Sequence, residues 1–290
     1  MNQAAQNLRD QLAGPDFLVQ PVVSDALTAR LCQQAGFPLA LLGGLPVAAV
    51  WYGLPDVGYI GRAEIAEAMR NISAACPGYP IIADGDTGYG NAMSVRHTVR
   101  EYARAGAACV LIEDQVWPKK CGHYQGGRPV IARAEARMKI RAAVEEAQDA
   151  DILVLARTDA RGSLGFDEAK ARLKAFEEEG ADILFAEALE SVEEMRVIGG
   201  SFKTPTVASM MPKTPVASRE SLRAMGFKIV AYNVLLSAAI KAMQDTLAAL
   251  KADKMDTAPP RIAMDQIAQI AGLNDYNRME QRYALAEAAE

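Results

Sequence analysis

Short apolar runs alternate with longer amphipathic segments along almost the whole chain, and this alternation constrains the fold more than any other feature. Each run is too short for a helix and lacks the polar alternation of a strand with one exposed face. We therefore predict strands that are buried on both faces, as in a parallel sheet covered by helices. The runs are Val19–Val23, Leu39–Leu42, Ile81–Ala83, Cys109–Ile112, Ile152–Ala156, Ile183–Ala186, Thr206–Ala208 and Lys228–Ala231.

Helical patterns separate these runs, and several of them end with a glycine just before the next run. A glycine at that place suits the left-handed residue that closes a helix. Repeated helix, glycine and buried run indicate the βα units of a parallel sheet. The clearest helical patterns are Ala63–Ala75, Ser94–Ala105, Glu135–Ala147, Asp167–Glu179 and Leu236–Leu250, and the glycines are Gly36, Gly106, Gly180 and Gly226.

The number of runs and the length of 290 residues predict an α/β fold, a single (β/α)₈ barrel domain over residues 1–290. A doubly wound open sheet is the alternative. It is less favoured because Gly85–Gly90 (GDTGYG) does not have the G-x-G-x-x-G spacing. We expect an N-terminal helix or arm at residues 1–16. A helical appendage is expected at residues 262–290, packed on the barrel or, as we favour, on a neighbouring subunit.

Composition excludes several classes of protein. The net charge of −5 leaves no overall basic footprint for nucleic acid. No apolar stretch approaches the ~20 residues that span a membrane, and residues 1–14 lack the apolar core of a signal peptide. The four cysteines form no CxxC pair and suit a reducing compartment. We expect a cytoplasmic protein with neither nucleic-acid nor membrane partners.

Polar and ionisable residues stand where the apolar runs stop. In a barrel, the carboxyl ends of the strands surround the active site. We therefore expect these side chains to converge on one mouth. The residues at the ends of the eight runs, two of them glycines, are Asp25, Gly43, Gly44, Asp84, Glu113, Arg157, Glu187, Ser209 and Asn233.

An acidic group without histidine is expected at this mouth. Asp84, Asp86 and Glu113 come from neighbouring strand ends, and Asp56 lies in the loop Gly53–Gly58 (GLPDVG). Such hard oxygen ligands suit Mg²⁺, or alternatively Mn²⁺. Capping and turn roles are the competing interpretation. Three acids on adjacent strand ends favour the metal site.

Two further features have open alternatives. Arg157 can grip a substrate carboxylate with two parallel hydrogen bonds, or it can form a salt bridge that only holds the barrel rim. The string Lys119–His123 (KKCGH) lies in a glycine-bearing loop, Asp114–Arg133. Cys121 beside cations can act as a proton donor or nucleophile. The competing interpretation is an ordinary exposed loop.

Four strings in this order resemble the isocitrate lyase and phosphoenolpyruvate mutase superfamily. The resemblance runs from about Phe17 to the C-terminus. The KKCGH string is similar to the lyase branch, which includes 2-methylisocitrate and 2,3-dimethylmalate lyases and the petal death protein group. The strings are Asp84–Gly90 (DGDTGYG), Glu113–Gln115 (EDQ), Lys119–His123 and Arg157–Asp159 (RTD).

The resemblance implies a barrel whose last helix is swapped between subunits of a homotetramer. It also implies that Asp84 ligates Mg²⁺, while Asp56, Asp86 and Glu113 hold the waters of the ion. Cys121 would be the catalytic acid on a gating loop with Lys119. Arg157 would bind a substrate carboxylate, and His123 and Glu187 would orient groups around the site.

Three positions depart from the family pattern. The family has Ser-Gly after its second strand, where this chain has Gly43-Gly44-Leu45 and offers only backbone N–H groups to the substrate. It has Asn where this chain has Ser209, and Pro where this chain has Asn233. These changes put the usual substrates in question and leave the metal ligands and Cys121 in place.

The leading hypothesis is therefore a Mg²⁺-dependent carbon–carbon lyase. It would cleave a malate-like 2-hydroxy di- or tricarboxylate, by retro-Claisen chemistry, into a 2-oxo acid and a carboxylate. The first alternative is an oxaloacetate hydrolase or decarboxylase of the same superfamily, motivated by Asn233 and the missing serine. The second is a barrel that binds a metabolite without catalysis, motivated by Gly43 and Ser209.

Overall fold

The structure is a computed structural model, which describes residues 2–120, 128–210, 214–216 and 218–283. The chain divides into two compact units, Met1–Leu236 and Ser237–Glu290. The second unit therefore begins before the predicted appendage at residues 262–290.

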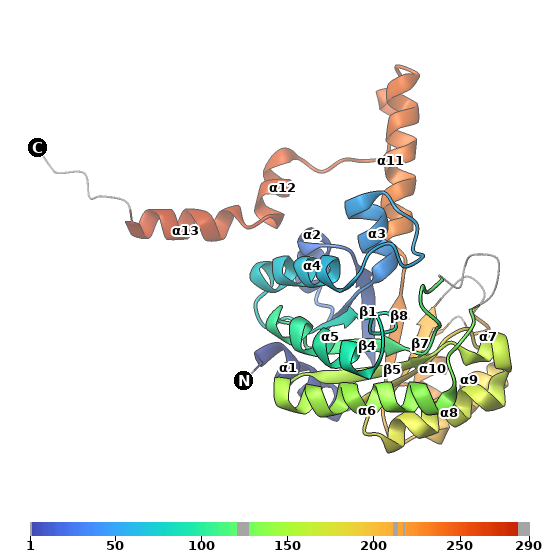
Figure 1. The fold of residues 1–290 in the computed structure, drawn as a ribbon. Helices are drawn as coiled ribbons and strands as arrows, with labels where there is room; N and C mark the ends of the chain where they lie inside the picture. Colours follow the sequence, from blue (N-terminus) through green and yellow to red (C-terminus); the bar gives the residue numbers. More distant parts are fainter. Residues whose placement is uncertain (1, 121–127, 211–213, 217, 284–290) are drawn as a thin grey trace, which may run out of the picture. The chain divides into compact units, whose positions relative to one another are not determined.

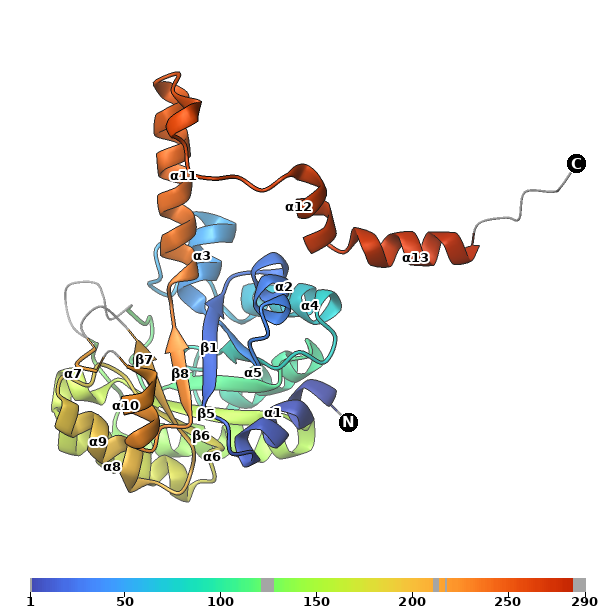
Figure 2. The same ribbon diagram turned by 180° about the vertical axis from the view of Figure 1, so that it is seen from behind.

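Eight parallel strands form a closed barrel in the first unit, in chain order (Figure 1). Each strand pairs with the next, and β8 returns to pair with β1 (Figure 2). This confirms the predicted (β/α)₈ barrel and excludes the open sheet. The strands are β1 (Leu18–Val23), β2 (Ala40–Leu42), β3 (Ile81–Asp84), β4 (Cys109–Glu113), β5 (Leu153–Thr158), β6 (Ile183–Ala186), β7 (Thr206–Met210) and β8 (Ile229–Tyr232).

Helices follow the strands and cover the outside of the barrel (Figure 1). In the first unit they are α1 (Gln3–Ala13), α2 (Ala26–Gln34), α3 (Gly44–Tyr52), α4 (Arg62–Ala75), α5 (Ala92–Arg104), α6 (Arg133–Ala150), α7 (Ala160–Leu164), α8 (Phe166–Glu178), α9 (Val192–Ser201) and α10 (Arg219–Ala224). The five clear helical patterns in the sequence correspond to α4, α5, α6, α8 and α11 (Leu235–Lys251), within three residues at each end.

Glycines end several of these helices as predicted. The backbone φ angles of Gly36, Gly106, Gly180 and Gly226 are 79°, 91°, 90° and 96°. Left-handed backbone of this kind is accessible to glycine without a Cβ penalty. The chain therefore stops each helix and turns into the next strand within a few residues.

Alternate residues of each strand face two separate cores. In β5, Leu153 and Leu155 pack inside the barrel, while Val154 and Ala156 pack against the surrounding helices. The inner core includes Leu8 of α1, together with residues at the starts of several strands. Helix α1 therefore closes the amino end of the barrel, and the carboxyl end remains for the site.

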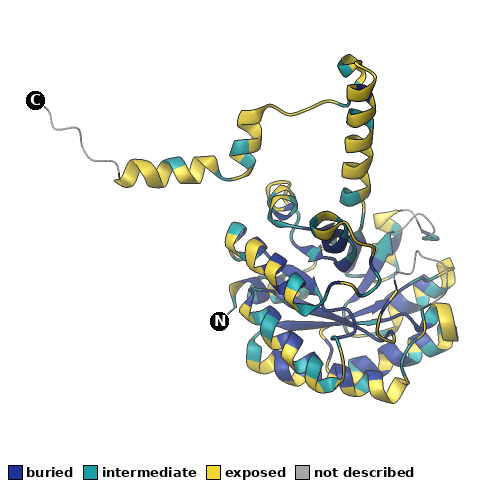
Figure 3. Ribbon diagram, turned by 45° about the horizontal axis from the view of Figure 1, so that its top comes forward, coloured by how far each residue is buried: buried dark blue, intermediate teal, exposed yellow. Residues whose placement is uncertain are grey.

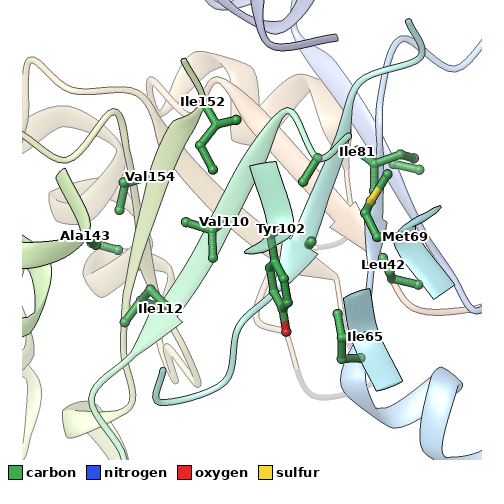
Figure 4. Packing of buried hydrophobic residues seen from close by; sticks show 14 of the residues in the cluster. Leu42, Ile65, Met69, Ile81, Tyr102, Val110, Ile112, Ala143, Ile152 and Val154 are labelled. Atoms are coloured by element: carbon green, nitrogen blue, oxygen red, sulfur yellow. The ribbon is translucent and has the colours of Figure 1, made fainter. Parts of the chain in front are cut away.

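The outer core lies between the strands and the helices. Figure 4 shows Val110 and Ile112 of β4 and Tyr102 of α5, which belong to this core. Figure 3 shows the strands buried inside the barrel and the outer faces of the helices exposed. This packing holds the strands rigidly, so the residues at their carboxyl ends have fixed positions.

The second unit contains most of α11 (Leu235–Lys251), the short helix η1 (Met255–Thr257), α12 (Met264–Ile270) and α13 (Leu273–Tyr283). Large apolar side chains on it are exposed, among them Met243, Leu247 and Met279. In the described part of the chain, no helix is both long enough and apolar enough to cross a membrane.

Candidate functional site

One pocket lies at the carboxyl ends of the strands. Its lining includes every site residue predicted from the sequence except Asp25, Asp86, Cys121 and His123. Cys121 and His123 lie outside the described residues. The residues around the pocket are Val22, Leu41, Gly43, Gly44, Leu45, Pro46, Asp56, Asp84, Glu113, Gln115, Lys119, Lys120, Arg128, Arg157, Phe185, Glu187, Ser209, Ala231 and Asn233.

The predicted acids gather around the ammonium group of Lys119. Its Nζ lies 2.7 Å from Oδ1 of Asp56 and 2.6 Å from Oδ1 of Asp86. Backbone N–H groups hold the third acid, because Gly44 donates to Asp84 Oδ2 over 2.9 Å and Asp86 donates to Asp84 Oδ1 over 3.0 Å. We call Asp56, Asp84, Asp86 and Glu113 the acidic cluster.

Burial dominates the electrostatics of this cluster. It raises the pKa of Asp86 to about 7, although Lys119 acts in the opposite direction. Burial likewise raises the pKa of Glu113 well above its usual value. Burial lowers the pKa of Lys119, but the surrounding carboxylates outweigh it and hold that pKa well above normal. Four carboxyl groups therefore lie around the ammonium group of Lys119, and Glu113 alone among them also approaches the guanidinium of Arg157, so acids outnumber cations and a further cation is favoured.

The acidic cluster fits a divalent cation. Within the described residues, the buried oxygens Asp86 Oδ2 and Glu113 Oε1 have no hydrogen-bond partner. Such buried acceptors are costly unless a ligand or water satisfies them. The same residues provide no group of three side chains placed as direct metal ligands. Magnesium usually takes one or two carboxylates and keeps several waters, so this arrangement is compatible with it.

Strained backbone places one of these acids. Asp86 has a φ of 46°, in the left-handed region that residues other than glycine rarely adopt. Its carbonyl accepts a 2.8 Å hydrogen bond from the N–H of Glu113. Strain of this kind often persists where function requires it, so it supports a functional role for Asp86.

Arg157 lies on the other side of the pocket. Its Nε and Nη2 each donate to the carboxylate of Asp159 over 2.9 Å. Glu113 and Glu187 lie 3.4 and 3.5 Å from the same guanidinium. The ring centre of Phe185 is 5.4 Å from its Cζ. Arg157 therefore forms rim salt bridges and also lines the pocket, so both interpretations from the sequence remain open.

Part of the lining is apolar. Val22, Leu41, Phe185 and Ala231 come from β1, β2, β6 and β8. A Cβ on Gly43 would lie only 2.9 Å from Val22 Cγ1, so the valine takes the space of a side chain there. The pocket thus combines an acidic side, a guanidinium and an apolar wall.

Several lining residues were missed in the sequence. Gln115 is distinguished in the sequence only as part of the EDQ string, and its Oε1 accepts a 3.1 Å hydrogen bond from the N–H of Lys120. Arg128 forms an ion pair with Asp159. Phe185 stands inside an apolar run, and only its inward position in the strand alternation distinguishes it as a lining residue.

Comparisons with known proteins agree with this architecture. Residues 8–251 match the family model described as phosphoenolpyruvate phosphomutase. The chain is 39% identical to the 2,3-dimethylmalate lyase of Eubacterium barkeri, covering 98% of this chain and 99% of that protein.

Two solved structures are similar along nearly the whole chain. Oxaloacetate acetylhydrolase in complex with 3,3-difluorooxalacetate has a TM-score of 0.91 and 32% identity, covering 97% of each chain. Phosphonopyruvate hydrolase in complex with oxalate and Mg²⁺ has a TM-score of 0.85 and 30% identity, covering 98% of this chain and 99% of that one. The chain therefore belongs to the phosphoenolpyruvate mutase and isocitrate lyase superfamily.

Proposed function

We propose that this chain is a Mg²⁺-dependent carbon–carbon lyase that cleaves a malate-like 2-hydroxy acid carrying alkyl groups. The lyase activity follows from the family and from the dimethylmalate lyase relative. The observation that carries the substrate proposal is the pocket itself, where the acidic cluster, Arg157 and an apolar wall face one another.

The metal is assigned to the acidic cluster. Asp84 is the proposed direct ligand, with Asp56, Asp86 and Glu113 around the waters of the ion. The two unpartnered carboxylate oxygens support this assignment, as does the Mg²⁺ in the phosphonopyruvate hydrolase complex. When bound, Mg²⁺ supplies a Lewis acid for the hydroxyl and carboxylate oxygens of the substrate.

Arg157 and the start of α3 hold the substrate. Arg157 binds a carboxylate through its guanidinium. The N–H of Gly44 is occupied by Asp84. The N–H of Leu45, at the second position of α3, has no partner within the helix, and the N-cap residue Gly43 has no side chain that could accept from it. We assign that group to a substrate oxygen, as the end of a helix dipole favours an anion.

The remaining side chains of the pocket orient the substrate and shield it from water. Glu187 contacts Arg157 and, in this proposal, helps to orient its guanidinium toward the pocket. Ser209 and Asn233 offer hydrogen bonds to polar groups of the substrate. Val22, Leu41, Phe185 and Ala231 receive its alkyl groups, because an apolar wall cannot satisfy a second carboxylate there.

The reaction breaks the bond between the hydroxyl-bearing carbon and its neighbour. The hydroxyl releases its proton to the solvent, its carbon becomes the carbonyl of a 2-oxo acid, and the electron pair of the broken bond passes to the departing carbon. We assign the proton that this carbon receives to Sγ of Cys121, and a supporting role to Lys119 and His123. The KKCGH string and its similarity to the lyase branch support this assignment.

A substrate panel tests the proposal. Purified protein is incubated with 2-hydroxy di- and tricarboxylates and with oxaloacetate, with Mg²⁺ or with EDTA, and products are followed by proton NMR. We expect a 2-oxo acid from an alkylmalate only when Mg²⁺ is present, and none with Cys121→Ser. Turnover that is unaffected by EDTA or by Cys121→Ser contradicts the proposal.

Oxaloacetate hydrolysis is the second candidate. The similarity to oxaloacetate acetylhydrolase and the polar pair Ser209 and Asn233 in the lining favour it. In the same panel, oxalate and acetate from oxaloacetate alone would support this candidate, whereas pyruvate would indicate a decarboxylase.

We also propose a homotetramer in the cytoplasm. An exposed apolar stripe on α11, formed by Ile240, Met243, Leu247 and Leu250, supports packing of the second unit on another copy. The free, buried thiols of Cys32, Cys76 and Cys109 support a reducing compartment.

A further inference from the structure

A buried ionic network lies behind Arg157, outside the pocket lining. Nη1 of Arg172, on α8, lies 3.0 Å from Oδ2 of Asp114, which follows β4. Both residues are only 2% exposed. Neither borders the pocket. Two buried opposite charges stabilise a fold only when they are well paired, so this contact requires accurate geometry.

Asp114 connects this pair to the segment that carries Arg157. Its Oδ1 accepts a 2.9 Å hydrogen bond from the backbone N–H of Asp159. Its Oδ2 accepts a 2.7 Å bond from the hydroxyl of Thr158. The two residues that follow Arg157 are therefore both tied to one carboxylate, which fixes the end of β5.

Asp159 completes the connection. Its carboxylate receives two parallel hydrogen bonds from Arg157 and an ion pair from Arg128. It is 2% exposed, whereas the side chain of Arg157 is 18% exposed. A continuous series of hydrogen bonds thus runs from Arg172 through Asp114 and Asp159 to the guanidinium in the pocket.

We propose that Arg172 is a positioning residue for Arg157, through Asp114 and Asp159. The proposal rests on the proposed function to the extent that Arg157 binds the substrate carboxylate. Arg172 holds the carboxylate of Asp114 in place, Asp114 fixes the backbone of Asp159, and Asp159 fixes the direction of the guanidinium. A guanidinium held in advance loses less freedom when the substrate binds.

The geometry explains why this residue is an arginine. Nη1 of Arg172 reaches Asp114, and its Nε donates to Glu168 over 2.9 Å. Glu168 also pairs with Arg133 of α6. A planar guanidinium can hold two acids in fixed directions at once, whereas the single ammonium group of lysine cannot reproduce this fork.

Lys139 offers a matched control. It lies on α6, is 4% exposed and interacts electrostatically with Asp114. It makes no ion pair with any residue that the structure describes. Replacing either cation with methionine removes one buried positive charge near Asp114. Only the change at position 172 removes a hydrogen bond from the network.

The first test compares the steady-state kinetics of Arg172→Met, Arg172→Lys and Lys139→Met on the acid that the wild type turns over. We expect KM to rise by roughly tenfold in Arg172→Met, with kcat within about threefold of the wild type, since uniform binding of a carboxylate is weakened. Arg172→Lys should be intermediate, and Lys139→Met should keep the wild-type KM. Equal KM changes in the two methionine variants would overturn the proposal.

The second test does not depend on the substrate. The Nε–H of Arg157 is followed by ¹⁵N NMR and assigned by its loss in Arg157→Lys. We expect it to shift and broaden in Arg172→Met and to stay unchanged in Lys139→Met. An unchanged signal in folded Arg172→Met would overturn the positioning role, even if the panel of acids identified no substrate.

A milder variant tests the same connection if Arg172→Met does not fold. Thr158→Val removes the 2.7 Å bond to Asp114 and leaves every charge in place. We expect it to move the Arg157 signal in the same direction, by a smaller amount. A signal identical to that of the wild type would contradict the connection through Asp114.

Discussion

Gly44 shows how one residue shapes the acidic cluster. Its N–H donates to Asp84, so its backbone is fixed against the cluster. A Cβ there would lie 3.3 Å from both Asp84 Oδ2 and Lys119 Nζ, and 3.5 Å from Asp56 Oδ1. A side chain would therefore enter the space next to the acids that we assign to the metal.

We predict that Gly44→Ala weakens Mg²⁺ binding by roughly tenfold, because shifts of a few tenths of an ångström disturb a preorganised site. Isothermal titration with Mg²⁺ measures the effect. Gly162→Ala on α7 is the control, as its added Cβ would meet no described atom within 4 Å beyond the neighbouring residues and backbone of its own helix. Equal Mg²⁺ affinities in the two variants would argue against a metal at the acidic cluster.

The site residues that could be predicted from the sequence are those that stand at the ends of strands. Asp84 and Glu113 end β3 and β4, so their convergence follows from the barrel alone. Their contacts do not follow from it. The pairing of Arg172 with Asp114 joins residues 58 positions apart on a helix and a loop. No spacing rule predicts such a contact.

At the scale of elements, helices α5 and α6 pack side by side and are joined by a buried acid. Glu146 of α6 pairs with Arg100 over 2.6 Å and with Arg96 over 2.9 Å, both on α5. The side chain of Glu146 is 4% exposed. Its hydrogen bond from Arg100 is the main reason that its pKa is lowered.

The lowered pKa predicts a dependence of stability on pH. The charged form of Glu146 stabilises the fold at pH values above its ordinary pKa, about 4.3. That contribution is lost as the pH falls through the lower value of the folded state. We expect Glu146→Gln to cost about 1 kcal/mol of unfolding free energy at pH 7 and progressively less as the pH falls through that lowered pKa.

Urea denaturation at several pH values measures this difference. Glu193→Gln is the control, because Glu193 and its partner Arg196 are exposed and such pairs contribute little. A Glu146→Gln difference that stays constant down to the most acid pH would contradict the account.

The strands were predictable because they are buried on both faces, which leaves mostly apolar residues in them. The ends of the strands were less predictable. The run Ile152–Ala156 extends as β5 to Thr158, because Arg157 and Thr158 remain in register with Phe185 and Ala186 of β6. Helices α3 and α9 were not among the clear helical patterns. Helix α3 (GLPVAAVWY) carries no charged residue, so it has no amphipathic contrast to detect.

At the scale of the whole molecule, the second unit exposes apolar side chains in a regular pattern. Ile240, Met243, Leu247 and Leu250 are 39%, 58%, 64% and 61% exposed and recur every three or four residues on α11. Such a stripe usually packs against another element. The described part of the second unit leaves it uncovered, and we propose that a second copy of the chain covers it.

We predict that Met243→Glu combined with Leu247→Glu lowers the oligomer mass, because four charges per pair of stripes cannot be buried together. Size-exclusion chromatography with light scattering measures the mass. Lys241→Ala, a change at an exposed position of the same helix, should leave it unchanged. An unaltered mass in the double variant would contradict packing through this stripe.

The central claim is that this barrel breaks a carbon–carbon bond and protonates the departing carbon. The most direct test is one NMR experiment on an alkylmalate in D₂O with Mg²⁺, in which both products are quantified together. The account predicts equal amounts of a 2-oxo acid and a carboxylate. The carboxylate carries one deuterium on the departing carbon, which was bonded to the hydroxyl-bearing carbon in the substrate. Consumption of the acid without a 2-oxo acid, or a carboxylate without deuterium at that carbon, would contradict it.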